Sequence, residues 1–521
     1  MSTKNSKAKA DRRDSNTLKS TSKEGARVEA KTDSIGIAQK GSFFDSRSIK
    51  DLIKEVQDVY LADSRPWVVG YSGGKDSTAV AQLVFYAIEK LPAEKRKKKV
   101  YVISSDTLVE TPVIVNHITD SMRMIGEAGK AKSLPIETEI VKPAIDETFW
   151  VNMIGKGYPA PTKQFRWCTH RMKIKPANKF ILDRASESGE VVVVLGVRSA
   201  ESATRQQAIA LHKIPGQLLS RHSTLPNAFV YAPVVDFTTE DVWTFLLQTP
   251  NPWGGDNNKL LALYRNAQQG ECPLVIDNTT QSCGNSRFGC WTCTVVKADK
   301  SMTAMIDNGE EWMEPLLQFR EFLAATTDPA VKEQYRDYKR RDGRVMIQTR
   351  GEAAGEDSVV LGPYKFEVRQ DMLRRLLLIQ KQIHATQPTL ELITREELRE
   401  IRKLWMAEQQ DWADSLSRIF FEVFGFEFET PLDEKPRFSS DDLELLKGLA
   451  GTEGVSWQMV AQLLEIEAET DSMARRSNIF GRLEKVLGEA WGSLDEEVQR
   501  LKTLEQMKLK VRNDSTLRGE A

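Results

Sequence analysis

The sequence predicts an α/β protein with a doubly wound, mostly parallel sheet and a C-terminal helical region. Between residues 48 and 198, short apolar runs alternate with helical patterns. Such alternation is typical of a parallel sheet with helices on both faces. After Lys297 the strand signal fades and long charged helical patterns follow. A sheet of this kind binds its ligands at the carboxyl ends of its strands.

Each element of the predicted sheet has its own signal. Ser48 is a candidate N-cap for the first helix. An apolar run typical of a strand buried on both faces lies at residues 66–74, and further strands are expected at residues 100–106, 137–143 and 191–198. One helix is expected directly after the glycines of the first run, and another through residues 118–128.

The C-terminal half contains helical patterns only. They cover residues 310–325, 370–385, 395–416, 439–450 and 496–512. Thr394 and Glu397 have the spacing of a capping box for the third of these. We therefore predict four parts, which are a flexible basic arm over residues 1–44, an α/β domain over 45–300, a helical domain over 301–425 and a helical tail over 426–521.

The overall composition limits the possible functions. The 521 residues contain 73 Lys plus Arg and 74 Asp plus Glu, so there is no general signal for a polyanionic partner. The apolar runs are too short to cross a membrane, and the first 25 residues have no apolar signal core. We expect a cytoplasmic protein without a membrane partner. The basic arm either touches nothing or contacts nucleic-acid phosphates.

The strongest motif is SGGKDS at residues 72–77, between a buried strand and a helix. There, successive backbone N–H groups and the positive end of the helix create an anion site. The spacing is not that of a Walker A loop, because Asp76 stands where a hydroxyl residue would follow Lys75. The motif resembles the loop of the PP-loop ATP pyrophosphatases. That resemblance implies an ATP site at Ser72, Gly73, Gly74, Lys75, Asp76 and Ser77, with Lys75 and Asp76 as catalytic residues.

Further polar residues follow two other predicted strands. Asp106, Thr107, Glu110 and Thr111 come after the second strand, and Arg198, Glu201 and Arg205 after the fourth. The arginines suit phosphate, and Glu201 suits Mg²⁺ or an arginine. With the loop, these elements resemble the phosphoadenosine phosphosulfate (PAPS) reductase family. The resemblance implies the adenine nucleotide alpha hydrolase-like fold of that superfamily, with Asp106, Arg198, Glu201 and Arg205 completing the ATP site.

Four of the five cysteines crowd into residues 272–293, in a segment that ends CGNSRFGCWTC. Cys272, Cys283, Cys290 and Cys293 supply four thiolates with one C-x-x-C pair. Such a set holds either tetrahedral Zn²⁺ or a 4Fe–4S cluster. A zinc ribbon usually has two C-x-x-C pairs, so the single pair favours the iron–sulfur cluster.

The fifth cysteine, Cys168, lies in the basic segment QFRWCTHRMKIKP. Nearby cations lower the pKa of a thiol, so we expect a reactive thiolate here that carries sulfur as a persulfide. The alternative is a small buried residue beside a basic surface.

The loop, the single cysteine in WCT-x-x-x-K-x-K-P and the CGNSRFGCWTC segment together resemble the DndC family, the sulfurtransferases of bacterial DNA phosphorothioation. The resemblance spans roughly residues 45–300. It implies a 4Fe–4S cluster on Cys272, Cys283, Cys290 and Cys293, with Cys168 as the sulfur-handling catalytic thiol. It also implies DNA as substrate, and a cysteine desulfurase and other Dnd proteins as partners. Cluster-bearing PAPS reductases have a Cys-Cys pair where this chain has Cys168 and Thr169, so the choice of four ligands among five stays open.

The implied reaction fits the residues. Adenylation of a DNA phosphate oxygen by ATP turns that oxygen into a leaving group that a sulfur nucleophile can displace. DNA would need a basic surface, for which residues 335–344, the segment around Cys168 and residues 95–99 are candidates. The alternatives are a reductase of adenylyl sulfate or PAPS, a tRNA thiolase, and a non-catalytic sensor of ATP. No cysteine follows Cys293, which disfavours a reductase with a C-terminal catalytic thiol.

Overall fold

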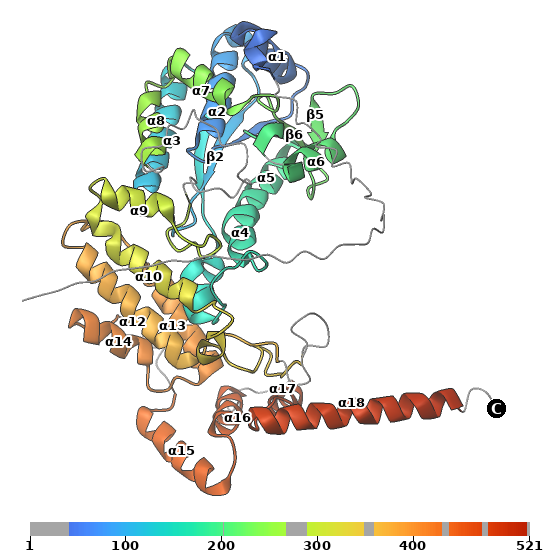
Figure 1. Ribbon diagram of the computed structural model, residues 1–521, viewed down its shortest axis with the longest axis vertical. Helices are drawn as coiled ribbons and strands as arrows, with labels where there is room; N and C mark the ends of the chain where they lie inside the picture. The colour runs from blue at the N-terminus through green and yellow to red at the C-terminus, as the bar shows by residue number, and fades with distance from the viewer. Residues whose placement is uncertain are drawn as a thin grey trace, which may run out of the picture. The chain divides into compact units, whose positions relative to one another are not determined.

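The described residues contain one sheet of six strands, in the order β3-β2-β1-β4-β6-β5 (Figure 1). The computed structural model describes residues 41–201, 203–266, 289–347, 359–429, 437–470 and 478–517. The strands are β1 (Trp67–Gly70), β2 (Val100–Ser105), β3 (Ile136–Val141), β4 (Val191–Val194), β5 (Leu219–Arg221) and β6 (Ala228–Tyr231). Only β5 is antiparallel to its neighbour. The predicted fold class is confirmed, although β5 and β6 were not expected.

The central strands are apolar on both sides because helices cover both faces of the sheet. All four valines of β4 are buried. One face packs on α5 (Lys175–Ser188), through Ile181 and Ala185. The other face lies under α1 (Ile49–Leu61), α2 (Lys75–Glu89), α3 (Pro112–Ala131) and α7 (Thr239–Gln248). The two layers of helices are visible in Figure 1.

In the first half of the chain, the structure shows which residues begin the predicted helices. Ser48 caps α1 through a capping box with Asp51, as predicted. The helix expected over residues 118–128 is longer, because Pro112 occupies its first turn, where a missing N–H costs no hydrogen bond. Phe43 and Phe44, at the end of the predicted arm, pack against Phe237.

The segment that carries Cys168 has an irregular backbone. It begins with α4 (Trp167–Thr169), passes through a π-helical turn at His170–Ile174 and continues into α5. A second π-helical turn covers Val151–Gly155. Single π-helical turns occur mostly as local insertions at functional sites. The remaining helices of this half are α6 (Ala203–His212) and α8 (Asn257–Asn266).

The helical region shares its core with the sheet region. The bounds of its helices are α9 (Lys300–Asp307), α10 (Glu314–Ala325), α11 (Lys332–Tyr335), α12 (Phe366–Ile383), α13 (Arg395–Gln409) and α14 (Ser415–Phe424). Trp150 donates its indole N–H to the carbonyl of Leu392, at 2.6 Å, and Trp405 donates to Ile154, at 2.9 Å. One continuous set of buried apolar residues extends from α1 to α14.

The prediction of a single helix over residues 395–416 is wrong in one respect, since two helices lie in this range. Thr394 and Glu397 form the predicted capping box of α13. The helix then ends at Gln410, whose φ of 52° is left-handed. Asp411 accepts hydrogen bonds from the backbone N–H and the hydroxyl of Ser415, so its side chain satisfies the first turn of α14. A polar side chain that caps a new helix outweighs the helical propensity of its neighbours.

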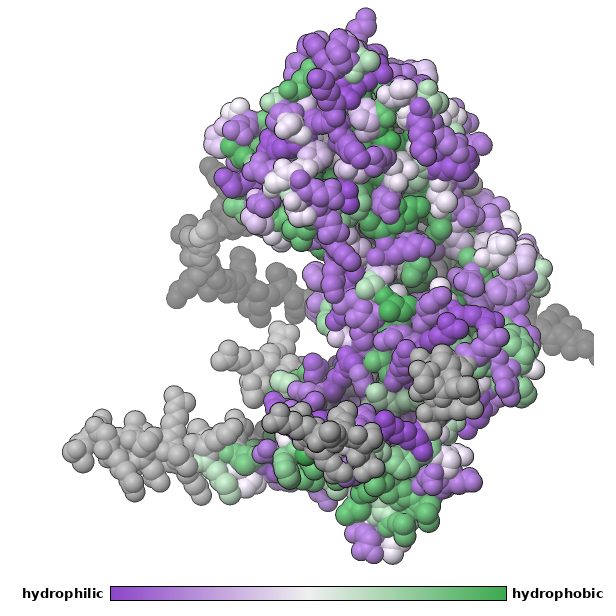
Figure 2. Space-filling model, turned by 180° about the vertical axis from the view of Figure 1, so that it is seen from behind, coloured by the Kyte–Doolittle hydropathy of each residue, from purple (hydrophilic) through white to green (hydrophobic). Residues whose placement is uncertain are grey.

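The last helices form a smaller assembly with its own apolar contacts. They are α15 (Ser440–Glu453), α16 (Trp457–Thr470), α17 (Ile479–Leu487) and α18 (Leu494–Leu517). Several of their large apolar side chains are exposed, including Leu445, Leu449 and Phe480. Figure 2 shows hydrophobic side chains gathered at this end of the chain. Among the described residues, no helix is both long and apolar enough to span a membrane.

Candidate ATP and cysteine site

The SGGKDS loop has the geometry of an anion cradle. Gly73 has a φ of 71°, and a Cβ there would lie 2.6 Å from Ile118 on α3, so only glycine fits. The hydroxyl of Ser77 accepts the backbone N–H of Ser72, at 3.2 Å, and donates to the carbonyl of Gly74, at 3.0 Å. The loop therefore closes on itself at the N-terminus of α2, where an anion is most stable.

Asp76 lies between two cations. Its carboxylate accepts hydrogen bonds from Lys75, at 3.0 Å, and from the Nε of Arg198, at 2.6 Å. The Arg198 side chain is only 4% exposed and also donates to the carbonyl of Phe237. Three predicted ATP-site residues thus meet at one point. Glu201 lies in the turn directly after Arg198, while the side chain of Arg205 lies outside the described residues.

Gly196 holds the loop against the sheet. It follows β4, and a Cβ added there would lie 2.8 Å from the carbonyl carbon and oxygen of Asp76 and 2.9 Å from the nitrogen of Ser77. The absence of a side chain lets the two backbones touch.

Two further residues, which were not predicted from the sequence, contact this loop. The Nε2 of His117, on α3, lies 3.2 Å from the carbonyl of Gly73. Burial lowers the pKa of His117, so the ring is neutral and donates its Nε2 proton to that carbonyl. Tyr264, on α8, accepts the backbone N–H of Lys75 through its hydroxyl, at 3.2 Å. A lone His or Tyr in a helical pattern gives no sequence signal for such a role.

The segment after β2 joins the nucleotide edge of the sheet to the cysteines. Asp106 pairs with Lys142, at 3.5 Å, and accepts the backbone N–H of Leu108, whose φ of 63° is left-handed. A non-glycine residue in this region stores strain, which is common near functional sites. Thr107 lies 3.4 Å from the sulfur of Cys290, and Thr111 bonds the carbonyl of Gly289 through both its N–H and its hydroxyl.

Three of the five cysteines line one cavity of about 300 Å³. Cys168 comes from α4, and Cys290 and Cys293 come from the C-x-x-C pair, whose backbone turns back on itself through a bond from the N–H of Cys293 to the carbonyl of Cys290. Lys173 and Arg166 also line the cavity. Cys168 is therefore a neighbour of the C-x-x-C pair, although the sequence separates them widely.

The expectation of a lowered Cys168 pKa is wrong. Burial, assisted by the nearby Cys293, raises the pKa of the Cys168 thiol. Burial also raises the pKa of Cys290, to about 11. The basic residues of the segment do not compensate, because carboxylates neutralise them. Arg171 and Lys175 both pair with Glu147, and Lys173 pairs with Glu110, at 3.0 Å.

Lys173 lines the cavity and interacts electrostatically with Cys290. Burial works against its charge, but Cys290 and Glu110 outweigh burial and raise its pKa. Lys173 therefore keeps its proton beside the cavity, where a positive charge stabilises any thiolate or anionic sulfur that occupies it.

The helical region holds the C-x-x-C segment in place. Arg320, on α10, is fully buried and donates to the carbonyls of Cys293, at 2.9 Å, Lys297, at 3.2 Å, and Val296. Trp291 is buried and packs against the rings of Trp150 and Phe319. Sequence reasoning missed Arg320, whose only signal is a charged residue within an apolar helical pattern.

The residues around the cavity fit a metal cluster held by thiolates. Three thiols face one space, and the hydroxyl of Thr292, between the two C-x-x-C cysteines, is buried with no hydrogen-bond partner among the described residues. An orphaned donor of this kind suits the sulfurs of a cluster. Within the described ranges, no three His, Cys, Asp or Glu side chains form a complete metal site. Cys272 and Cys283, which were predicted as ligands, lie outside the described residues.

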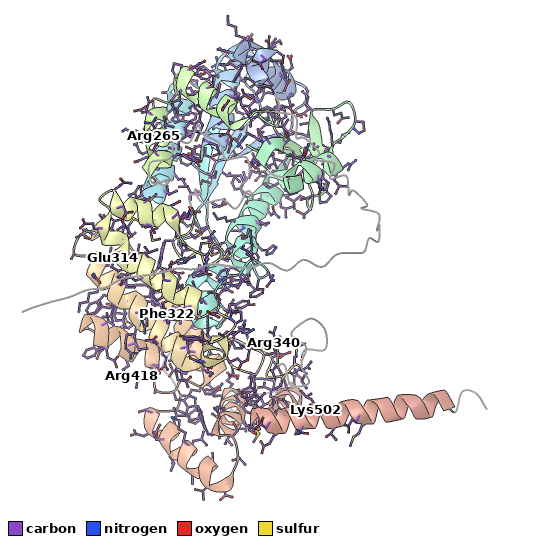
Figure 3. The ribbon with its side chains drawn as sticks, in the orientation of Figure 1. Arg265, Glu314, Phe322, Arg340, Arg418 and Lys502 are labelled. Carbon is purple, nitrogen blue, oxygen red and sulfur yellow. The ribbon has the colours of Figure 1, made fainter. Side chains whose placement is uncertain are left out.

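In two of the three predicted basic surfaces, several of the cations bond within the protein, while Lys95, Lys97, Arg341 and Arg344 are exposed. In the run at 95–99, Lys98 is buried against Asp63, Lys99 pairs with Glu137 and Arg96 donates to backbone carbonyls. In the segment 335–344, Arg336 donates to the carbonyls of Gly362 and Leu361, and Arg340, labelled in Figure 3, also donates to Leu361. Charge runs in sequence do not distinguish such internal pairing from a free surface.

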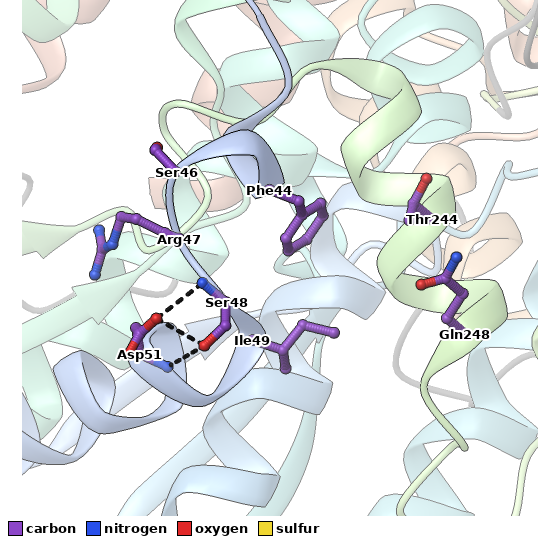
Figure 4. A pocket seen from close by; sticks show the side chains of 8 residues that line it. All are labelled: Phe44, Ser46, Arg47, Ser48, Ile49, Asp51, Thr244 and Gln248. Atoms are coloured by element: carbon purple, nitrogen blue, oxygen red, sulfur yellow. Dashed lines mark hydrogen bonds between the residues drawn. The ribbon is translucent and has the colours of Figure 1, made fainter.

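A second hollow lies away from these residues. It is open, measures about 520 Å³ and lies between the start of α1 and α7 (Figure 4). Its polar lining is already paired, since Ser48 and Asp51 bond each other in the capping box and Arg47 pairs with Glu55. None of the predicted site residues lines this hollow.

Comparison with known proteins supports the resemblance at the level of the domain. Residues 66–296 match the profile of the phosphoadenosine phosphosulfate reductase domain. An uncharacterised protein of Methanocaldococcus jannaschii is 24% identical over 204 residues, which are 39% of this chain. The match covers 36% of that relative, so this chain corresponds to little more than a third of its length.

Solved structures with partial likeness include enzymes of several activities. PAPS reductase from Candida auris shares 15% identity over 41% of this chain and 92% of its own, with a TM-score of 0.24. A tRNA thiolase from Methanococcus maripaludis with its 4Fe–4S cluster shares 13% identity over 55% of this chain and 82% of its own, with a TM-score of 0.27. In sequence, residues 66–296 are similar to the phosphoadenosine phosphosulfate reductase domain.

Proposed function

We propose that this protein is an ATP-dependent sulfurtransferase that adenylates a backbone phosphate of DNA and replaces a non-bridging oxygen with sulfur. The observation that carries the proposal is the course of α3. Its N-cap residue, Thr111, bonds Gly289 beside Cys290, and His117 bonds Gly73 of the SGGKDS loop. Thr111 and His117 lie about 9 Å apart along this helix, which rises about 1.5 Å per residue. A nucleotide on the loop and sulfur in the cavity would therefore be close neighbours.

The ATP half of the reaction follows from the loop. The N–H groups at the start of α2 and the ammonium of Lys75 would hold the departing pyrophosphate. Asp76, fixed by Lys75 and Arg198, is oriented to accept Mg²⁺ together with the ATP phosphates. A phosphate oxygen of the acceptor attacks the α-phosphorus of ATP, the bond to the β-phosphate oxygen breaks, and pyrophosphate leaves. The acceptor then carries AMP.

The sulfur half uses the cavity. Hydrosulfide attacks the adenylated phosphorus, a P–S bond forms and AMP is expelled, and the ammonium of Lys173 stabilises the negative charge of the nucleophile at this edge of the cavity. A cysteine desulfurase is the proposed sulfur source, a thiol reductant would supply the two electrons that convert its persulfide sulfur into hydrosulfide, and other Dnd proteins are the proposed partners. The choice of DNA as acceptor is supported by the resemblance of the CGNSRFGCWTC segment to the DndC family.

We further propose that Cys168 is one of the cluster ligands, together with Cys290 and Cys293. All three thiols line one cavity, where a bound metal would supply the positive charge that their thiolates need. The fourth ligand is then Cys272 or Cys283. A bound 4Fe–4S cluster would supply a site that holds inorganic sulfur next to the activated acceptor.

The decisive experiment compares phosphorothioate dinucleotides in nuclease-digested DNA by mass spectrometry. Cells that lack the gene are complemented with the wild type, with Asp76→Asn or with Cys168→Ser. We expect the modification only with the wild type. Unchanged phosphorothioate levels in the deletion strain refute DNA as the acceptor. The same extracts are tested for thiolated tRNA nucleosides and for sulfite release from PAPS, which detect the thiolase and reductase alternatives.

The ligand assignment has a separate test. The protein is purified without oxygen, and iron per chain and absorbance near roughly 400 nm are measured for the single variants Cys168→Ser, Cys272→Ser and Cys283→Ser. We expect Cys168→Ser and one of the other two to lose the cluster, while the third keeps it. Full iron in Cys168→Ser would restore Cys168 to the role of a sulfur-carrying thiol.

A further inference from the structure

A short turn at residues 162–165 holds an aromatic side chain out of the protein. The backbone N–H of Thr162 donates to the carbonyl of Phe165, at 3.3 Å, and the backbone N–H of Phe165 donates to the carbonyl of Thr162, at 3.2 Å. The side chain of Phe165 is 44% exposed at the end of this closed turn. A single exposed phenylalanine is ordinary on its own, and the setting of Phe165 is what distinguishes it.

The turn is anchored on both sides. Before it, the carbonyl of Pro161 accepts the hydroxyl of Thr294, at 2.6 Å, in the residue after the C-x-x-C pair. After it, Trp167 donates its indole N–H to the carbonyl of Pro159, at 2.9 Å. Phe165 is thus held in a defined place with little conformational freedom to lose when it binds a partner.

Phe165 is also the outer member of an aromatic stack. Its ring is parallel to that of Tyr158, with 2° between the planes and 6.3 Å between the centroids. The guanidinium of Arg171 lies over the ring of Tyr158 and donates to its hydroxyl, at 3.0 Å. Tyr158 is therefore held in place, and the partly exposed ring of Phe165 packs on it.

The stack lies at the rim of the cysteine cavity. Pro161 and Arg166, the residues on either side of the turn, both line that cavity together with Cys168 and Cys293. Lys163, at the tip of the turn, is exposed. An aromatic face with cations beside it, next to the proposed site of sulfur transfer, combines the two elements that proteins use to bind a nucleic-acid strand without reading its sequence.

We propose that Phe165 is a stacking platform for an unpaired base of the DNA substrate, with Lys163 and Arg166 contacting the adjoining phosphates. This inference rests on the proposed function and adds to it how the substrate is held. A base that is turned out of the duplex and stacked on Phe165 would extend the aromatic stack of Tyr158 and Phe165. The phosphate beside that base is then presented to the cavity instead of being held within a regular duplex.

The test measures binding of the whole protein to a DNA oligonucleotide that contains 2-aminopurine, whose fluorescence falls when it stacks. Wild-type protein should bind and quench the fluorescence. Phe165→Ala should bind about 5- to 150-fold more weakly and should not quench, because base–aromatic stacking contributes about 1 to 3 kcal/mol per base. Phe165→Trp should restore both binding and quenching, since it keeps an aromatic face.

Phe421→Ala is the matched control. Phe421, on α14, is 52% exposed and lies far from the turn in sequence. We expect wild-type binding and quenching from this variant, and thermal unfolding is measured for every variant to exclude misfolding. If wild-type protein binds DNA and Phe165→Ala binds equally well, the platform is refuted and DNA modification is untouched. If wild-type protein binds RNA of the same sequence but no DNA, both the platform and the proposed DNA acceptor are wrong.

Discussion

The contact between Gly196 and the start of α2 can be tested by adding a single methyl group. In Gly196→Ala, the new Cβ would lie 2.8 Å from the carbonyl carbon of Asp76, while ordinary carbon contacts are about 3.5 Å. The backbone of the loop must therefore move by about 0.7 Å. Such overpacking costs about 1 to 3 kcal/mol of folding free energy. A shift approaching 1 Å in a catalytic group costs up to about a hundredfold in rate, so we expect a loss of about 10- to 100-fold in kcat/KM for ATP cleavage.

The assay is exchange of labelled pyrophosphate into ATP, with urea unfolding measured in parallel. Gly448→Ala is the control, because a Cβ at that position on α15 meets no atom within 4 Å. Alanine in a helix is more stable than glycine by about 0.5 to 1 kcal/mol, so this variant should be slightly more stable and should keep wild-type exchange. A Gly196→Ala protein with wild-type kcat/KM would show that the close approach does not position the loop.

Three further predictions concern single side chains. Asp76→Asn should abolish pyrophosphate exchange and lower the thermal unfolding midpoint, because Arg198, which is 4% exposed, loses its charged partner; a normal midpoint would contradict the buried pair. Burial opposes the Glu147 carboxylate, but hydrogen bonds from Lys175 and Arg171 outweigh it and hold the pKa of Glu147 below 4.5. Its stabilising effect is therefore complete above that pH and is lost as the pH falls through the lowered pKa. Urea unfolding of Glu147→Gln should show a deficit of about 1 to 3 kcal/mol at pH 7 that shrinks below pH 4.5, and a deficit independent of pH would refute the charged pairing. Arg320→Lys should lower iron per chain and absorbance near roughly 400 nm, since an ammonium cannot bond the carbonyls of Cys293, Val296 and Lys297 together; full iron would show that this clamp is not needed for the cluster.

The fold was predictable where local signals and burial agree. Val191–Val194 is apolar throughout because both faces of that strand are covered, and the capping residues Ser48 and Thr394 stand directly before their helices. The short strand β5 lies at the edge of the sheet, where Leu219–Arg221 is only partly buried, and its neighbour β6 has only four residues, so the apolar signal is weak. The break after α13 contains two left-handed residues, Gln410 and Asp414, which propensity alone does not reveal.

The candidate site was predictable as separate motifs but not as an arrangement. SGGKDS and the C-x-x-C pair each have a spacing that implies chemistry, and Arg198 meets Asp76 as expected. The charge environment of Cys168 was not predictable, because sequence shows its basic neighbours and hides the carboxylates of Glu147 and Glu110 that neutralise them. Gly196, His117 and Arg320 act through backbone contacts that only the folded chain creates.

Helix α3 has a consequence for regulation. A rigid helix that holds Gly289 at its first residue and Gly73 less than two turns later cannot shift at one end alone. If a nucleotide on the loop changes the affinity of the thiols for iron by some factor, the metal must change the affinity for the nucleotide by the same factor. A protein without the proposed cluster would then also bind ATP with a different affinity, and this reciprocity would couple the two halves of the proposed reaction.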